Sequence, residues 1–138
     1  MKSLKIASAI SITILITGCV PHWTQTQCTT TDLNQQGLMD GRAGMSSDRF
    51  TKYQTDCNRF KITLSHAKYS QGWRIGNRQY CQPTNLYNLG RGGSAYPVVC
   101  NSSPAQRNAY SRGHQKFTKI QALKSRIASI DNQLNKTE

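Results

Sequence analysis

The sequence has few acidic residues, no apolar run long enough to span a membrane, and none of the short motifs that mark common enzymes. Only six Asp and Glu stand against 18 Lys and Arg in 138 residues, which gives a net charge of +12. No G-x-S-x-G, H-E-x-x-H or Walker lysine pattern occurs. The sequence therefore carries no signal of a serine hydrolase, a zinc peptidase or a nucleotide-binding loop. A chain of this length accommodates one small domain.

The first nineteen residues predict export and lipid attachment. Lys2 and Lys5 precede an uncharged apolar run from Ile6 to Ile16, which is too short to cross a bilayer and is typical of a secretory signal. The run continues into a segment that resembles the bacterial lipobox, Leu15-Ile16-Thr17-Gly18-Cys19. This resemblance implies cleavage before Cys19 and a covalent lipid on Cys19; no other cofactor is expected.

Cleavage at this point divides the chain into a targeting segment, residues 1–18, and a mature protein of 120 residues with a net charge of +10. Several acyl chains hold a protein firmly on a membrane without spanning it. Val20 stands where, by resemblance to the enterobacterial sorting rule, an Asp would retain the protein in the inner membrane. We therefore expect an envelope protein anchored in the outer membrane, with residues 19–27 forming the anchor and a short linker.

Four cysteines remain in the exported chain and predict two disulfides, because the periplasm oxidises thiols and small domains need covalent constraints. They are Cys28, Cys57, Cys81 and Cys100. Of three pairings we favour Cys28 with Cys57 and Cys81 with Cys100, since each pair encloses one local unit. No C-x-x-C or H-x3-H spacing accompanies them, so neither a metal site nor a catalytic thiol is expected.

Glycines recur at helical spacing through residues 28–102, with an aromatic residue beside them. A Tyr-x2-Gly element repeats at Tyr69, Tyr87 and Tyr110. Glycine in a helix costs about 1 kcal/mol relative to alanine, so these stripes need an offsetting gain. Residues three or four apart share one helix face, where glycine admits a neighbouring backbone or ring. We expect a mainly α, small disulfide-stapled domain of short glycine-packed helices and turns; a phosphate-cradling role for Gly90-Arg91-Gly92-Gly93 is the less favoured interpretation.

Serines mark the expected starts of helices. Ser47 is expected to cap a helix that turns Cys57 inward, and Ser65 to cap a helix that carries Tyr69. One segment is expected to be extended, Tyr96-Pro97-Val98-Val99-Cys100.

The last third of the chain predicts one long amphipathic helix over residues 103–134. Its start combines an N-cap serine, a proline at the first helical position and a capping-box glutamine, in Ser103-Pro104-Ala105-Gln106. Apolar residues then recur at heptad spacing, at Ile120, Leu123, Ile127, Ile130 and Leu134. About two heptads are too few to settle between packing on the domain itself and a short coiled coil, formed by self-association or with a partner helix.

This arrangement resembles a family of proteobacterial lipoproteins known as domain of unknown function 2799. The resemblance covers residues 28–134 and departs from the family at Trp73-Arg74-Ile75 and in the Phe60 to Leu64 loop. It is carried by Asp32, Gly37, Asp40-Gly41, Gly44, Cys57, Tyr69-x2-Gly72-x3-Gly76-x3-Tyr80-Cys81, Gly90-x2-Gly93-x2-Tyr96-x3-Cys100, Tyr110-x2-Gly113 and the closing heptad helix. It supports the expected lipoprotein and disulfides, and it implies no activity.

The basic residues of the second half favour binding over catalysis. The electrostatic field of these residues attracts anionic glycans, lipid headgroups and lipopolysaccharide phosphates, and this attraction weakens with salt. A nucleic acid would be attracted in the same way but is not expected in this compartment. A solvated face beside an acidic membrane remains the simplest interpretation. We expect a non-enzymatic structural or binding module for an envelope protein or an anionic envelope polymer, with weakly indicated contacts at Arg74, Arg78, Arg91, Arg107, Arg112, Lys116 and Lys119.

A small envelope hydrolase is the alternative. General acid–base hydrolysis needs two groups held together. Asp32 and Asp40 lie eight residues apart, about two helical turns, so both would occupy one helix face. A helix cap for Asp32 and a turn at Asp40-Gly41 are the commoner roles of such residues.

Overall fold

The computed structural model describes residues 22–136, which form helices and loops and contain no strand. Cys19 and the expected targeting segment lie outside the described residues. The expected mainly α fold with two disulfides and a long C-terminal helix is confirmed. In chain order the helices are α1 (Gln25–Thr30), α2 (Leu33–Arg42), α3 (Arg49–Asn58), α4 (His66–Tyr80), α5 (Pro83–Arg91) and α6 (Pro104–Leu134).

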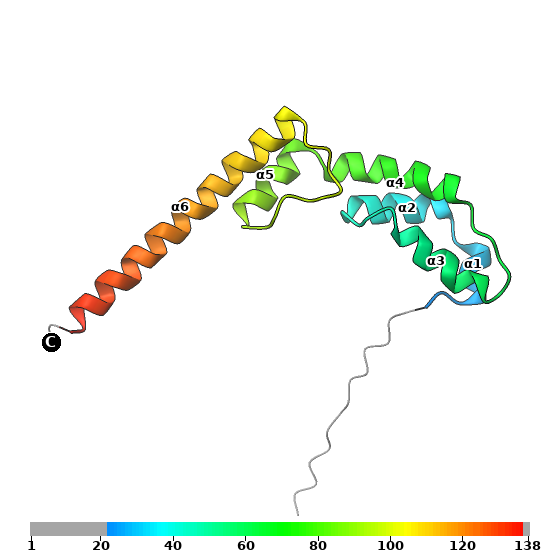
Figure 1. Ribbon diagram of the computed structural model, residues 1–138, viewed down its shortest axis with the longest axis horizontal. Helices are drawn as coiled ribbons and strands as arrows, with labels where there is room; N and C mark the ends of the chain where they lie inside the picture. The colour runs from blue at the N-terminus through cyan, green and yellow to red at the C-terminus, as the bar shows by residue number, and fades with distance from the viewer. Residues whose placement is uncertain (1–21, 137–138) are drawn as a thin grey trace, which may run out of the picture.

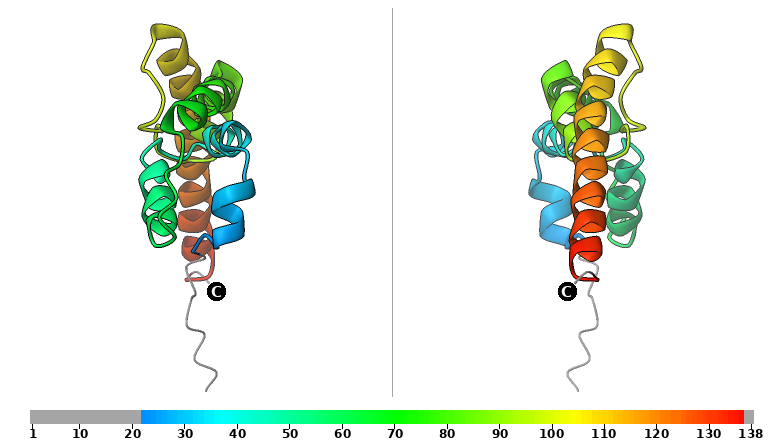
Figure 2. Two further views of the ribbon diagram at one scale, coloured as in Figure 1. Left: turned by 90° about the vertical axis from the view of Figure 1, so that its right-hand side faces the viewer. Right: turned by 90° about the vertical axis from the view of Figure 1, so that its left-hand side faces the viewer.

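The helices form two arms of an arch (Figure 1). The first half, residues 22–80, contains α1 to α4, with α2 packed along α4; the second half, residues 81–136, contains α5 packed along α6. Between the halves, the Asn77 amide donates to the Val99 carbonyl (3.1 Å). Beside this contact, the Gln106 amide donates to the Cys81 carbonyl (2.9 Å), at the residue that follows α4. The C-terminal part of α6 projects well past α5 (Figure 2).

Two of the three expected serine caps are confirmed. The Ser65 hydroxyl accepts the Lys68 N–H at the start of α4, and Ser103 forms a capping box with Gln106 at the start of α6. The cap expected from Ser47 is wrong: the N-cap of α3 is Asp48. Its backbone is already helical (φ −63°, ψ −15°), so its side chain does not reach the free N–H groups and makes no cap hydrogen bond.

Close contact of backbones explains the glycine stripes of the first half. A Cβ atom on any of four glycines would overlap backbone atoms of the facing helix. Two of them, Gly37 and Gly41, lie on α2 and face the carbonyls of Tyr69 and Trp73. The other two lie on α4 and face the carbonyls of Asn34 and Leu38; they are Gly72 and Gly76. At these four positions the two helices therefore touch backbone to backbone.

The second half repeats this arrangement on a smaller scale. A Cβ on Gly90 of α5 would overlap the Tyr110 carbonyl, and one on Gly113 of α6 would overlap the Tyr87 carbonyl. Each of these glycines faces a carbonyl and the backbone nitrogen four residues later, as Gly41 and Gly76 do in the first half.

The turns that follow α2 and α5 are also equivalent. Gly44 and Gly93 both have positive φ, +71° and +78°, and lie against an aromatic ring, that of Tyr80 in the first turn and that of Phe117 in the second. An aromatic donor closes each turn: the Trp73 Nε1–H donates to the Met45 carbonyl and the Tyr110 hydroxyl to the Ser94 carbonyl, both at 2.8 Å.

These contacts correct the repeat that the sequence indicates. By these contacts, Tyr110 of α6 is equivalent to Trp73 of α4 rather than to Tyr69. Tyr87 lies on α5, which corresponds to α2 and not to α4, and it is equivalent to Leu38. The Tyr-x2-Gly spacing therefore marks the glycine stripes correctly but aligns them out of register. The repeat is masked because an indole and a phenol perform the same hydrogen bond in the two halves.

Each half has its own core and its own disulfide. The first core is built from Leu33, Leu64, Tyr53 and Tyr69 around the Cys28–Cys57 bond. The second is built from Leu86 and partly buried aromatic and aliphatic side chains around the Cys81–Cys100 bond. Both favoured cysteine pairings are confirmed.

Two expected segments differ from the structure. Residues 96–100 are not extended but turn, with the Cys100 N–H donating to the Pro97 carbonyl (3.1 Å). The linker expected over residues 19–27 is shorter, because α1 begins at Gln25 behind a Thr24 capping box. Of the two alternatives for residues 103–134, the first part of α6 follows packing on the domain itself, since it packs on α5 and borders the second core.

Candidate functional site

The structure brings two of the expected basic residues, Arg74 and Arg78, to one groove at the junction of the two halves. They lie one helical turn apart on α4, and Asn77 lies between them. One hollow of about 300 Å³ is lined by Trp73, Val99, Asn101 and this segment of α4. A second of about 380 Å³ continues from it over Arg78 and is lined by Asn77, Cys81, Gln82, Pro83, Asn101, Ser103 and Gln106. We call the two hollows together the junction groove.

The walls of the junction groove are held by hydrogen bonds within the protein. The Asn77 amide donates to the backbone of the second half, and the Gln106 amide donates to the Cys81 carbonyl, directly after α4. Gln82 donates to the Arg78 carbonyl (3.2 Å). The Cys81–Cys100 bond ties the floor to the loop that precedes α6. The exposed residues Arg74 and Arg78 therefore border a surface that these bonds hold in place.

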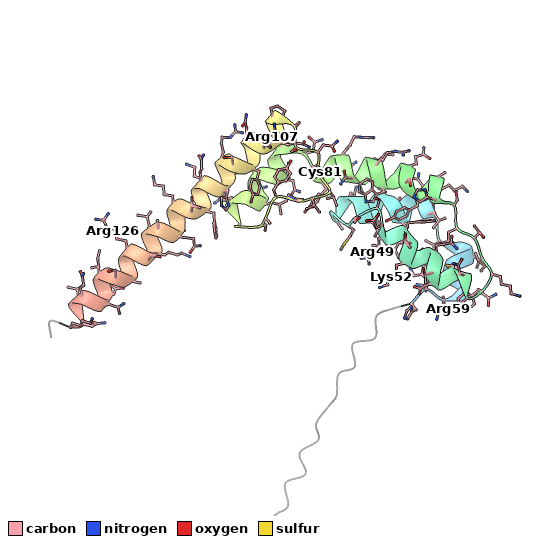
Figure 3. The ribbon with its side chains drawn as sticks, in the orientation of Figure 1. Arg49, Lys52, Arg59, Cys81, Arg107 and Arg126 are labelled. Carbon is pink, nitrogen blue, oxygen red and sulfur yellow. A yellow bond between two sulfur atoms is a disulfide. The ribbon has the colours of Figure 1, made fainter. Side chains whose placement is uncertain are left out.

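The remaining expected basic residues are distributed over the second half. Arg91 ends α5 and Arg107 lies in the first turns of α6, where its guanidinium donates to the Ser102 carbonyl. Further along α6 the basic residues, which include Arg112, Lys116 and Lys119, are exposed. Figure 3 shows Arg107 at the crest of the arch and Arg126 on the projecting part of α6. The structure thus separates one basic groove from one basic helix.

The few acidic residues are placed unevenly along the chain. Between Asp56 and Asp131 the chain contains twelve Lys and Arg and no Asp or Glu. The four acidic residues of the first half precede this stretch, and two of them, Asp40 and Asp56, are buried. The basic residues of the junction groove and of α6 up to Arg126 therefore lie in a stretch of chain that contains no carboxylate side chain.

The two aspartates of the hydrolase alternative serve separate structural roles. Asp32 is the N-cap of α2, where its carboxylate accepts the N–H groups of Asn34 (2.9 Å) and Gln35 (3.2 Å). Asp40 lies two turns along α2 and is buried. The Asp40 carboxylate accepts hydrogen bonds from Tyr53 and Tyr69 (both 2.9 Å) and from the Gln36 amide (3.0 Å).

Burial and the Asp40 carboxylate keep both tyrosines protonated. Burial is the largest cause that raises the pKa of Tyr69, and the hydrogen bond to Asp40 raises it further. The pKa of Tyr53 is raised in the same way, although the Arg49 guanidinium, whose Nε donates to the Tyr53 hydroxyl (2.7 Å), opposes the shift. The network therefore fixes α2, α3 and α4 around one buried charge.

The first described residues are fastened to α3 through Asp56. The Asp56 carboxylate pairs with His22 Nδ1 (2.6 Å) and accepts the Trp23 N–H (3.0 Å), and these two interactions, in that order, lower the pKa of Asp56. The Trp23 ring stacks on Tyr53 with centroids 4.4 Å apart. The sequence indicates a linker here, because no spacing pattern connects His22 with a residue 34 positions later.

A second cleft of about 290 Å³ lies beside this segment. It is lined by His22, Trp23, Gln27, Gln36, Arg49, Lys52, Tyr53 and Asp56. Arg49 and Lys52 stand on the lower edge of α3 (Figure 3). Because Asp40 and Asp56 lie against the same residues, this cleft carries mixed charge, unlike the junction groove.

Metal binding and membrane spanning find no support in the part of the chain that the structure describes. Residues 22–136 contain no group of three or more His, Cys, Asp or Glu placed to hold a metal ion. None of the helices in this range is both long and apolar enough to span a bilayer.

Comparison with known proteins gives a family and nothing beyond it. No curated protein and no solved structure matches the chain. The sequence profile of one family, described as protein of unknown function (DUF2799), matches residues 32–119. This range runs from the N-cap of α2 to the end of the α5–α6 packing, so it contains both glycine-packed helix pairs and the junction groove. The chain belongs to the DUF2799 family.

Proposed function

We propose that this protein is a lipid-anchored module of the bacterial envelope that binds an anionic envelope polymer and catalyses no reaction. One observation carries the proposal: a preformed groove lined by Arg74 and Arg78 lies in a stretch of chain without a single acidic residue. Phosphate and carboxylate groups are the natural ligands of arginine, whose planar guanidinium forms paired hydrogen bonds with them. A polymer with repeated anionic groups would extend from the groove along the basic residues of α6.

The anchor is proposed from the lipobox alone. Trp23 is fastened to the folded domain only four residues after Cys19, so the tether would span at most about 14 Å. The proposed lipid would therefore hold the domain against the outer membrane surface. Replacement of Cys19 by Ser tests this step, since metabolic palmitate labelling of the protein should disappear; label that survives the substitution would contradict it.

Binding is tested on residues 19–138 with Cys19→Ser, which retains every described residue. Affinity for lipopolysaccharide and for peptidoglycan is measured at about 50 and 300 mM salt, and we expect binding to one of them that weakens with salt. The double variant Arg74→Ala, Arg78→Ala should weaken this binding at least about tenfold, the equivalent of about 1.4 kcal/mol.

The matched control removes the same charge outside the groove. Lys61 and Lys68 are exposed residues of the first half. The variant Lys61→Ala, Lys68→Ala should keep affinity within about twofold, as expected for dispersed surface charges. Equal losses in the two variants, or no salt-sensitive binding to either polymer, would contradict the proposal.

A further inference from the structure

The projecting part of α6 carries an apolar face that this chain does not cover. From Thr118 to Lys136 every residue is exposed, because the contacts of α6 with α5 end at Phe117. The apolar positions include Leu123 and Ile127, which are 52% and 59% exposed. A helical segment of this length gains little stability from itself in water. We call the face the α6 seam; it comprises Ile120, Leu123, Ile127 and Ile130.

The α6 seam continues the face with which α6 packs on α5. Gly113, which contacts the α5 backbone, is followed at seven-residue intervals by Ile120 and Ile127. The seam is one heptad stripe wide, with polar residues directly on both sides, which is the pattern of a helix that packs against another helix.

Charge on the edges of the α6 seam has one dominant sign. On one edge, Arg112, Lys119 and Arg126 form a row at seven-residue intervals. On the other edge, Lys124 is followed one heptad later by Asp131, the only acidic residue of α6. In a coiled coil these edge positions face the edges of the partner helix and select it by charge.

A second copy of the chain fits this pattern less well than an acidic helix does. In a parallel pair Lys119 would face Lys124 of the copy, and only Arg126 would face an Asp131. In an antiparallel pair the cationic row would face itself, and only Lys124 would face an Asp131. Like charges placed opposite each other oppose association, and the rest of the second half adds positive charge.

An anionic membrane surface also fits poorly. An interfacial helix buries a broad apolar face between its basic residues. The α6 seam is only one heptad stripe wide, so it presents less apolar area than such a helix buries. An acidic helix, in contrast, supplies apolar knobs for the seam and carboxylates for the cationic row.

We propose that the α6 seam docks an acidic amphipathic α-helix of another protein in a short coiled coil. This inference goes beyond polymer binding and uses a different surface, so either can fail without the other. The side chain of Arg126, on one edge of the seam, points away from the rest of the molecule and is accessible to a partner (Figure 3). The partner is defined by its chemistry: Leu or Ile at heptad spacing, flanked by Glu or Asp.

Two synthetic probes test the seam. Both are three-heptad peptides with Ile and Leu at the core positions; one has Glu at all edge positions and the other has Lys. Binding to residues 19–138 with Cys19→Ser is measured by fluorescence anisotropy. We expect the acidic peptide to bind at least about tenfold more tightly than the basic one, and this preference to fall with salt.

Three variants separate the seam from general charge. Leu123→Ser with Ile127→Ser should abolish binding of the acidic peptide while thermal unfolding is unchanged, since both residues are exposed. Lys119→Glu with Arg126→Glu should reverse the preference between the peptides. The control, Lys61→Glu with Lys68→Glu, makes the same charge change outside α6 and should retain the preference for the acidic peptide.

Other outcomes overturn the inference. They are equal binding of the two peptides, no binding of either, a dimer of the protein alone in sedimentation that the serine variant abolishes, or tighter binding to phosphatidylglycerol vesicles than to the acidic peptide. Failure of these tests with intact, Arg74-dependent polymer binding would leave the proposed function standing. Loss of polymer binding alone would leave the seam standing.

Discussion

Single glycines determine how closely the helices of this protein approach each other. At six positions in the two helix pairs, a Cβ atom would overlap backbone of the facing helix, which no rotamer change can relieve. Overpacking of this kind typically costs 1–3 kcal/mol. Gly92 differs, since a Cβ there would have its nearest neighbour at 3.4 Å and φ is −80°.

Gly72→Ala should therefore lower the free energy of unfolding by about 1–3 kcal/mol, because its Cβ would overlap the Asn34 carbonyl and force α2 and α4 apart. Gly92→Ala is the matched control and should stay within about 0.5 kcal/mol of the wild type. Urea denaturation measures both. Equal effects of the two changes would show that α2 and α4 do not touch as described.

The buried Asp40 carboxylate is the acceptor for two tyrosine hydroxyls. Asp40→Ala leaves the hydroxyls of Tyr53 and Tyr69 without their acceptor, so we expect a loss of at least about 2 kcal/mol in the free energy of unfolding. Asp32→Ala removes a helix cap on the surface and should cost about 1 kcal/mol. A larger loss at Asp32 than at Asp40 in urea denaturation would contradict these roles.

Asp56 predicts a dependence of stability on pH. Its pKa is lowered from the ordinary value of 3.8, chiefly by the hydrogen bond with His22. A lowered carboxylate pKa stabilises the folded state fully above the ordinary value, and this stabilisation is lost as the pH falls through the lowered pKa. Asp56→Asn should therefore destabilise the protein at pH 7 and by less at pH 3, as measured by urea denaturation. An equal deficit at both pH values would exclude this linkage.

At the level of the helices, the two disulfides are expected to stabilise the fold by similar amounts, but they join different parts of the molecule. Cys28–Cys57 joins α1 to α3 within the first half, whereas Cys81–Cys100 joins the end of α4 to the loop before α6 and forms part of the junction groove. Their sequence separations are 29 and 19 residues. Closing loops of this size stabilises a folded chain by about 3 kcal/mol through the unfolded state.

Replacing either cysteine pair by serine should thus lower the free energy of unfolding by about 3 kcal/mol in urea denaturation. Only the pair Cys81→Ser, Cys100→Ser should also weaken polymer binding, because it releases the floor of the junction groove. The pair Cys28→Ser, Cys57→Ser is its control. If both variants lost polymer binding to the same degree, the junction groove would not be the binding site.

For the whole molecule, the structure divides a folded body from a projecting helix. Deletion of residues 119–138 removes residues that, as far as they are described, are all exposed, and it leaves Gly113 and Phe117 on α5. The thermal midpoint should therefore change by no more than a few degrees, while the helical signal in circular dichroism falls. A large drop in the midpoint would mean that α6 stabilises the body beyond Phe117.

Local patterns in the sequence were sufficient for several features of the fold. The cysteine spacing predicted both disulfides, and Ser103 with Pro104 and Gln106 predicted the start of α6. Capping and helical periodicity act within a few residues, so spacing alone reveals them. Glycine stripes likewise indicated close contacts, although not which helix lies opposite.

Contacts between distant residues were beyond such reasoning. Nothing in the spacing pairs His22 with Asp56, places the hydroxyls of Tyr53 and Tyr69 on Asp40, or brings Arg78 over a groove formed with Asn101. The equivalence of Trp73 and Tyr110 was hidden as well, because two different side chains make the same hydrogen bond.

By itself the sequence determined a basic, helical, disulfide-bonded chain with a heptad stripe in its last third, because composition, cysteine number and periodicity are properties of neighbouring residues. Only the tertiary structure decided that two glycine-packed helix pairs repeat one arrangement, that the scarce carboxylates are largely used within the first half, and that the basic residues divide into a groove and a projecting helix. The physical reason is that helix pairing depends on which surfaces fit at backbone distance, and this fit involves residues far apart in the chain.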